Sequence, residues 1–356
     1  MSTIAEKLKY LLETKELIKE AVNAKGGSLT SEDTFRSYAN AVENLETGTG
    51  STKYNITIDS ILGDVDDDGV LQSPSAAGDL IFTDVKDISD NAMYYLFRCN
   101  TSITSVSFPA LTSVSGSNAM YYAFSDCTSL TDVSFPELTT VSGSSCMYYV
   151  FYNCTGLTSV SFPALTTVSG FSALYYAFYY CTGLTSVSFP ALATISGSYG
   201  MYYVFYNCTS LTTVSFPVLT SVGANGMNYA FSGCTGLTSV SFPKLETIDK
   251  NGMYYAFYNC SLTSISFPSL TSIGQNAFRN CTSLTKIWIP STVTDISASS
   301  YSYSPFYSCS SNLVIYTDIA SEDDIPSGWG TYWNYYGSGK TLTVVYGASE
   351  EDFENA

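Results

Sequence analysis

One pattern of apolar and polar residues recurs along most of the chain. The unit from Cys127 to Val141 reads CTSLTDVSFPELTTV, and the same phrase returns four more times, next from Cys154 to Val168. The Phe-Pro pairs begin at residues 108, 135, 162, 189, 216, 242 and 267, so their spacing is 27 residues four times, then 26 and then 25. Periods of roughly 20–50 residues are typical of repeat proteins. The pattern therefore predicts one solenoid rather than two globular domains.

Each unit contains one segment with the alternation of a short strand. Val133 and Phe135 are apolar and Ser134 between them is polar, so the apolar side chains share one face. Pro136 ends the strand, because proline cannot donate a hydrogen bond to a sheet. The Tyr-Tyr-Val-Phe portion that follows suits a turn or short helix on the opposite side. A single unit cannot bury its apolar face, so neighbouring units must stack and align their strands in a parallel sheet.

The residues from Ile273 to Val293 carry a family resemblance. They read IGQNAFRNCTSLTKIWIPSTV, which resembles the BspA-like type of leucine-rich repeat, I-G-x-x-A-F-x-x-C-x-x-L-x-x-I-x-I-P-x-x-V. The resemblance covers about residues 80–312 and implies a curved solenoid used for adhesion and for protein or glycan contact, without catalysis. The earlier units depart from it by inserting about five residues before the Phe, usually with Met-Tyr-Tyr.

Ten cysteines are present, and nine of them keep the repeat register. One cysteine per unit offers neither the paired spacing of a disulfide framework nor the CxxC pairs of a metal site. We therefore expect a ladder of buried, small apolar side chains. Cys146 is out of register and has no assigned role. The nine in register are Cys99, Cys127, Cys154, Cys181, Cys208, Cys234, Cys260, Cys281 and Cys309.

The inserts bring tyrosines into columns, and two interpretations of these columns stay open. The rings either pack rung upon rung, or form a partly exposed ridge that binds sugar faces or a partner protein, since tyrosine combines an apolar ring with a hydroxyl. The outward strand positions are nearly all serine, and these small, uncharged side chains offer a ligand few contacts. Trp288 breaks this serine pattern. It is either a contact point for a ligand or part of a C-terminal cap. The candidate contact residues are Tyr121, Tyr148, Tyr175, Tyr202, Tyr254 and Trp288.

Residues 2–24 are predicted to form a helix, and a second helix is expected from about residue 31. The first has apolar positions at Ile4, Leu8, Leu11, Ile18 and Val22. This segment resembles the N-terminal segments of bacteriophage tail and fibre proteins, which implies docking to other virion proteins. Self-association, for example as a trimer, is the alternative. We assign residues 1–48 to docking or oligomerisation, 49–86 to an N-terminal cap and first partial repeat, 87–312 to repeats, and 313–356 to a C-terminal β cap with an acidic tail.

The stretch from Asp64 to Gly69 has the D-x-D-x-D-G opening of a calcium loop. The twelfth position is Ser75, where such a loop needs a bidentate glutamate. Asp64, Asp66 and Asp68 are therefore a weak calcium candidate, and no cofactor is expected.

Composition narrows the function classes. The formal net charge of −17 disfavours nucleic acid and anionic membranes as partners. No apolar run approaches a membrane span, and the N-terminus lacks the pattern of a secretory signal. Histidine is absent, which removes the commonest general base, so we expect no enzyme. The leading hypothesis is a phage virion protein, made in the host cytoplasm, whose solenoid binds host-surface glycan or protein. The alternative is a bacterial BspA-like surface adhesin.

Overall fold

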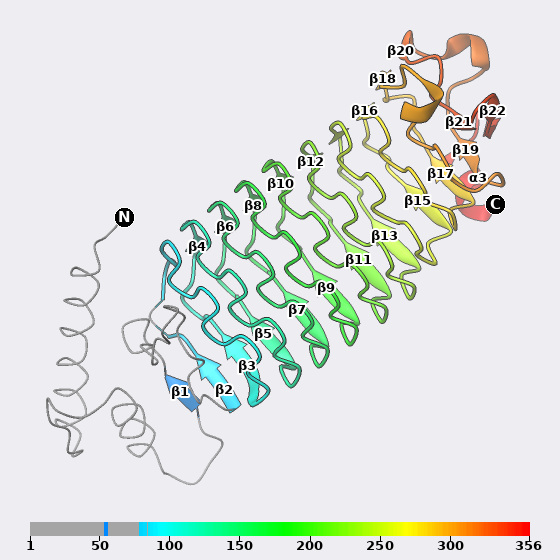
Figure 1. Cartoon of the computed structure of the whole chain (residues 1–356). Helices are drawn as coiled ribbons and strands as arrows, with labels where there is room; N and C mark the ends of the chain where they lie inside the picture. Colours follow the sequence, from blue (N-terminus) through cyan, green and yellow to red (C-terminus); the bar gives the residue numbers. More distant parts are fainter. Residues whose placement is uncertain (1–52, 56–77, 84) are drawn as a thin grey trace, which may run out of the picture.

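The computed structural model describes residues 53–55, 78–83 and 85–356, and over most of these the chain winds as a solenoid of stacked rungs (Figure 1). The strands at the Val-Ser-Phe segments pair in parallel and in register, for example Val133 with Val160. They form an eight-stranded sheet, and a four-stranded sheet follows it along the solenoid. The first contains β1 (Lys53–Asn55), β2 (Gly78–Ile81), β3 (Ile103–Ser107), β5 (Asp132–Ser134), β7 (Ser159–Ser161), β9 (Ser186–Ser188), β11 (Thr213–Ser215) and β13 (Ser239–Ser241). The second contains β15 (Ser264–Ser266), β17 (Lys286–Trp288), β19 (Val314–Tyr316) and β23 (Thr343–Val345).

A second side of each rung forms another parallel sheet, which the sequence pattern did not predict. Its strands have two residues each, such as Thr140 and Val141, too short to show an alternation in the sequence. Only the second residue of each pair is buried in the core. The strands are β4 (Ser113–Val114), β6 (Thr140–Val141), β8 (Thr167–Val168), β10 (Thr194–Ile195), β12 (Ser221–Val222), β14 (Thr247–Ile248), β16 (Ser272–Ile273), β18 (Asp295–Ile296) and β20 (Gly328–Trp329).

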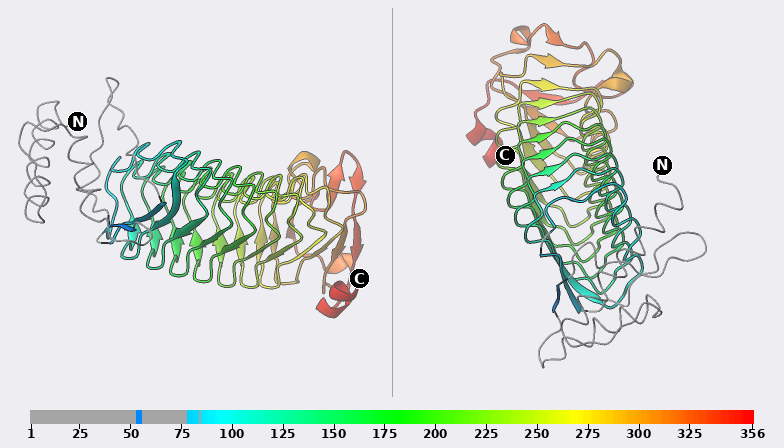
Figure 2. Two further views of the ribbon diagram at one scale, coloured as in Figure 1. Left: turned by 90° about the horizontal axis from the view of Figure 1, so that it is seen from below. Right: turned by 90° about the vertical axis from the view of Figure 1, so that its left-hand side faces the viewer.

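The third side of each rung, which carries the tyrosines, consists of turns, so the turn alternative is observed and not the short helix. Along this side, alternate N–H groups donate to carbonyl groups of the next rung; Met147 donates to Ala173 and Tyr149 to Tyr175, at 2.9 and 3.0 Å. The N–H groups between them donate three residues back, as Val150 does to Met147. Hydrogen bonds therefore join the rungs on all three sides. Figure 2 shows the resulting stack of rungs from two further directions.

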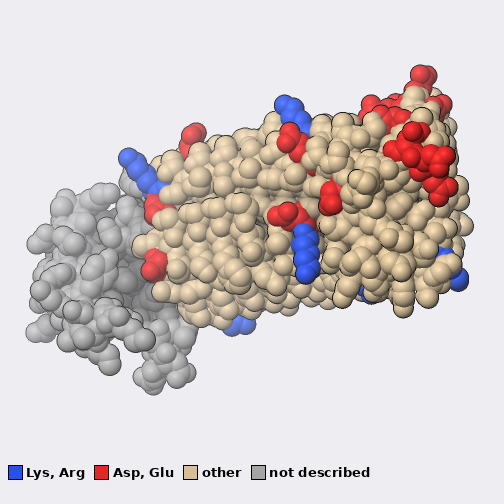
Figure 3. All heavy atoms as spheres, turned by 90° about the horizontal axis from the view of Figure 1, so that it is seen from above, with Lys and Arg blue, Asp and Glu red and all other residues tan. Residues whose placement is uncertain are grey.

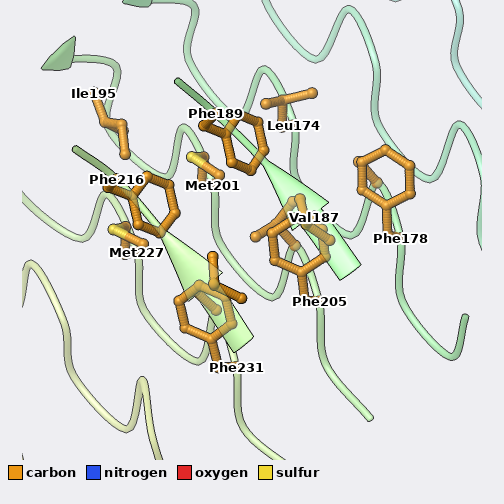
Figure 4. Close-up of a cluster of buried hydrophobic side chains, with 14 of the residues drawn as sticks. Leu174, Phe178, Val187, Phe189, Ile195, Met201, Phe205, Phe216, Met227 and Phe231 are labelled. Carbon is orange, nitrogen blue, oxygen red and sulfur yellow. The ribbon is translucent and has the colours of Figure 1, made fainter. Parts of the chain in front are cut away.

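The core is a continuous stack of phenylalanines, as the sequence predicted. Phe135, Phe162 and Phe189 are buried and aligned, with ring centroids 5.4 and 5.3 Å apart and nearly parallel planes. A second column, which includes Phe178 and Phe205, meets the first edge-to-face (Figure 4). Parallel rungs thus share one apolar interior.

The cysteine ladder is confirmed at eight of the nine positions. Cys154 and Cys181 are buried, and each thiol lies 3.1 Å from a phenylalanine carbonyl oxygen of the preceding rung. Burial raises the pKa of the Cys181 thiol to about 12, so this thiol stays protonated at neutral pH. Cys99 is the exception, because it is exposed. Cys146 is buried at the position that Ala119 and Ala173 occupy in adjacent rungs, so it acts as a small core residue.

The C-terminal residues add strands and one helix. The strands β19 and β23 continue the sheet after β17, and β21 (Tyr335–Gly337) and β22 (Lys340–Thr341) form an antiparallel hairpin. Two 3-10 turns, η2 (Tyr301–Tyr303) and η3 (Glu322–Asp324), lie between the strands. The acidic residues expected in a tail instead form α3 (Glu350–Asn355), which begins with a capping box between Ser349 and Asp352.

Trp288 is buried at this end. Its side chain is 3% exposed and packs against Phe353 of α3, with ring centroids 6.3 Å apart. Lys286 holds α3 in place, since its ammonium group donates to the carbonyl oxygen of Phe353 at 2.6 Å. The expectation of a ligand contact at Trp288 is therefore corrected: its burial favours the cap role.

Several expectations lie outside the described residues. These are the helices within residues 1–48, their apolar positions Ile4, Leu8, Leu11, Ile18 and Val22, and the calcium candidate Asp64, Asp66 and Asp68.

Candidate contact surface

The turn side of the solenoid presents tyrosines in three columns, which we call the tyrosine face. In the first column, the ring centroids of Tyr148 and Tyr175 are 4.9 Å apart and those of Tyr175 and Tyr202 are 4.7 Å apart, with planes within 17°. The rings are half-buried rather than hidden. The first column contains Tyr94, Tyr121, Tyr148, Tyr175, Tyr202 and Tyr254; the second contains Tyr95, Tyr122, Tyr149, Tyr176, Tyr203, Tyr229 and Tyr255; and the third contains Tyr152, Tyr179, Tyr206 and Tyr258.

The second column depends on an unusual backbone conformation. Tyr149 and Tyr176 have φ angles of 53° and 58°, in the left-handed region, as do the other members of this column. A bulky residue there costs on the order of 1–3 kcal/mol, and the hydrogen bonds between rungs offset that cost. The result is a herringbone, in which the rings of Tyr148 and Tyr149 meet at 64°.

Stacking decides which part of each ring a ligand can reach. Because the rings lie parallel along the column, each face inside it is covered by a neighbouring ring. Ring edges and hydroxyl groups form the exposed remainder. We therefore expect stacking on the face of a sugar only where a column is interrupted or ends.

The middle of the solenoid carries no charge. From residue 138 to residue 243 the sequence contains no Asp, Glu, Lys or Arg. Figure 3 shows scattered charges on either side of an uncharged stretch, with acidic side chains gathered toward the C-terminal end. The tyrosine face is thus suited to a neutral partner or to an uncharged part of one.

Burial raises the pKa of several tyrosine hydroxyl groups on this face. It raises the pKa of Tyr148, Tyr229 and Tyr254 to about 12, and neighbouring phenols add to the effect. The pKa of Tyr149 is raised further, for the same reason. At neutral pH these groups donate and accept hydrogen bonds without charge.

Alkaline pH is expected to unfold the solenoid. The phenols of an unfolded chain ionise near pH 10, whereas the folded state resists ionisation up to about pH 12 at Tyr148. Since the folded pKa is raised, the stability is fully present below about pH 10 and is lost as pH rises from there. We expect ionisation, followed by absorbance at 295 nm, to lag behind that of the guanidinium-unfolded chain and to rise together with loss of the circular dichroism signal. Ionisation of all 30 tyrosines near pH 10 with a native spectrum would contradict this.

The outward side of the first sheet offers fewer contacts. Ser161 and Ser188 are exposed, small and neutral. Threonine hydroxyl groups beside these strands already donate to carbonyl groups of the preceding rung, as Thr185 does to Thr158 at 3.0 Å. Substitutions on this face therefore serve as controls for substitutions on the tyrosine face.

One exposed aromatic residue escaped the sequence analysis. Phe171 is 56% exposed, and its ring centroid lies 5.8 Å from that of Tyr199. Adjacent units have Ser144 and Ser198 at the position of Phe171. That departure from the repeat was the signal available in the sequence.

The described part of the chain shows no metal site. No group of three or more His, Cys, Asp or Glu side chains within it is placed to hold an ion. Within the same residues, no helix has the length and apolar character needed to cross a bilayer.

Comparisons with known proteins agree with the repeat. The family model of the BspA type leucine rich repeat region matches residues 86–225, 147–251 and 201–319. No curated protein sequence matches the chain. Among solved structures, a leucine-rich repeat protein from Bacteroides ovatus is similar at 24% identity and a TM-score of 0.40, over 63% of this chain and 57% of that one. The pneumococcal vaccine antigen PcpA is similar at 14% identity and 0.31, over 85% and 91%. An internalin from Listeria monocytogenes is similar at 13% and 0.33, over 88% and 95%.

Proposed function

Because the chain belongs to the BspA type leucine-rich repeat family, whose model matches it from residue 86 to residue 319, we propose that it is a non-enzymatic surface-binding protein. Its tyrosine face attaches to a protein or glycan on a cell surface. The observation that carries this proposal is the ordered, half-exposed aromatic surface along an uncharged stretch of the solenoid.

Stacking prepares the tyrosine face for binding. Tyr148, Tyr175 and Tyr202 are held by their neighbours, so a partner need not immobilise them. Side chains ordered before binding reduce the entropy cost of association. Tyrosine also offers a large apolar contact area and a hydroxyl group with few rotatable bonds.

We place the bacterial surface adhesin ahead of the phage virion protein. The virion hypothesis depends on residues 1–48, which lie outside the described residues, and the comparisons do not support it. The repeat region is what the family model matches. Both hypotheses assign surface binding to the solenoid. They differ in whether a bacterial cell or a phage particle displays it.

Removing three rings from the first column is expected to weaken binding at least tenfold, or about 1.4 kcal/mol. The variant replaces Tyr148, Tyr175 and Tyr202 with serine, which removes ring edges and hydroxyl groups together. Binding of the labelled full chain to an array of surface proteins and glycans measures the effect, and circular dichroism checks the fold. A companion variant with phenylalanine at the three positions keeps the stack and removes only the hydroxyl groups.

The matched control changes a different side of the rungs. Ser134, Ser161 and Ser188 are replaced with asparagine on the first sheet, which alters three rungs without touching a tyrosine. We expect unchanged binding from this control. If the serine variant of the tyrosine face stays folded and binds as tightly as the parent chain, the proposed function is wrong.

A further inference from the structure

The first tyrosine column is interrupted at one rung. The spacing of the repeat puts Asn228 where a tyrosine stands in the rungs before and after, so one ring is missing between Tyr202 and Tyr254. The second column is unbroken at that rung, because Tyr229 stacks on both Tyr203 and Tyr255, at 4.4 and 4.8 Å.

The rings of Tyr202 and Tyr254 keep the orientation that first-column rings have in the other rungs. Tyr202 is still stacked on Tyr175 at 4.7 Å and meets Tyr203 at 67°. Tyr254 meets Tyr255 at 65°, the same herringbone angle. Two rung spacings separate Tyr202 from Tyr254, roughly 10 Å. Each ring therefore has one face that no ring of the first column covers, although Tyr229 of the second column meets both rings edge-on, with its ring centroid 5.9 Å from that of Tyr202 and 5.8 Å from that of Tyr254.

The side chain that interrupts the first column has an unused hydrogen-bond acceptor. Asn228 is 4% exposed, and its amide nitrogen donates to Oδ1 of Asn225 at 3.1 Å. The same oxygen accepts from the side chain of Asn251 at 3.4 Å. The Oδ1 atom of Asn228 is buried and has no hydrogen-bond partner. Buried acceptors are nearly always paired in native proteins, so this one points to a donor from outside the chain.

We propose that the gap at Asn228 binds one neutral pyranose ring, an assignment that rests on the proposed function of the tyrosine face. The two C–H faces of the sugar lie against Tyr202 and Tyr254, and one hydroxyl group donates to Oδ1 of Asn228. Entry requires Tyr229 to move back toward its own column, because Asn228 is buried and the ring of Tyr229 lies edge-on to both flanking rings.

Three features favour a neutral sugar over other rings. A pyranose carries hydroxyl donors around its edge, whereas a phenylalanine of a partner has none and a tyrosine has one at its tip. No charged residue precedes the gap back to residue 138. Among the cations that follow in the sequence, Arg279 contacts a flanking ring: its guanidinium lies 5.9 Å from the ring centroid of Tyr254 and 4.4 Å from that of Tyr307, and it donates to the carbonyl oxygen of Ser302 at 3.1 Å. A neutral sugar needs no partner charge in the gap.

The test uses the full chain and three methyl glycosides, those of glucose, galactose and mannose, in saturation-transfer difference NMR. We expect saturation of ring protons of at least one glycoside. Asn228→Tyr fills the gap with the residue of the repeat, so it should abolish that signal while leaving the melting temperature unchanged or higher. Asn228→Leu keeps a gap without the acceptor and should weaken binding at least tenfold. Ser161→Asn, on the first sheet and away from the tyrosine face, is the control and should bind as the parent does.

The possible results separate this inference from the proposed function. Absence of signal with all three glycosides, or equal signals from the parent and Asn228→Tyr, would overturn the inference. Binding of N-acetyltyrosinamide in their place would overturn the sugar class and identify an aromatic side chain as the occupant. If Asn228→Tyr still binds the array while the triple serine variant does not, the inference fails and the tyrosine face remains the contact surface.

Discussion

Phe162→Ala is expected to destabilise the solenoid by about 3–5 kcal/mol. The ring is fully buried between Phe135 and Phe189. Phe178 meets it edge-on, with the two ring centroids 6.2 Å apart. Its removal leaves a cavity in the middle of the stack. Hydrogen bonds on three sides fix the distance between rungs, so the neighbouring rings cannot close the space. Chemical denaturation followed by circular dichroism measures the loss.

The control for this prediction is the adjacent residue. Ser161→Ala lies on the same strand but points outward and is exposed, so its effect should stay within about 0.5 kcal/mol. Interior rungs depend on both neighbours, and we expect amide exchange in Phe162→Ala to rise first in the rungs on either side. A loss below about 1 kcal/mol would mean that the phenylalanine column is not a rigid core.

Gly170→Ala is expected to cost on the order of 3 kcal/mol, although it adds one methyl group. A Cβ atom at Gly170 would lie 2.2 Å from the carbonyl oxygen of Gly143 in the preceding rung. Both atoms belong to or adjoin the backbone, so no side chain can rotate to relieve the contact. The rungs must separate locally, which strains the hydrogen bond from the N–H of Gly170 to Val141. Denaturation of the purified variant measures this cost.

A second glycine provides the matched control. Gly337 lies in β21, and a Cβ atom there would meet only the side chain of Lys340, at 3.9 Å. Gly337→Ala should therefore change stability by less than about 0.5 kcal/mol. Equal losses in the two variants would show that the effect comes from glycine itself and not from the close approach of rungs.

The repeat made much of the fold predictable. A fixed spacing forces Phe135, Phe162 and Phe189 into one column, since only stacked units bury them. The same reasoning predicted the cysteine ladder. It failed at Cys99, which is exposed although it keeps the register. The strand at Thr140 and Val141 was missed because two residues carry no periodicity.

The contact surface was predicted less completely, for reasons of geometry. Spacing along the chain identifies which tyrosines share a column, but not that Tyr149 needs a left-handed φ of 53° or that stacking covers the ring faces. Trp288 stood out in the sequence, yet α3, which the sequence did not predict, buries it. Asn228 and Phe171 depart from the repeat in ways that acquire meaning only when the neighbouring side chains are placed.

The distribution of charge has a consequence for the speed of association. Attraction between opposite charges accelerates encounters between proteins and makes their rates sensitive to ionic strength. The rungs between residues 138 and 243 have no charge with which to steer a partner. The association rate constant for a partner that binds this flank should therefore be near the value without electrostatic steering, roughly 10⁵–10⁶ M⁻¹s⁻¹. It should change little between low and high ionic strength.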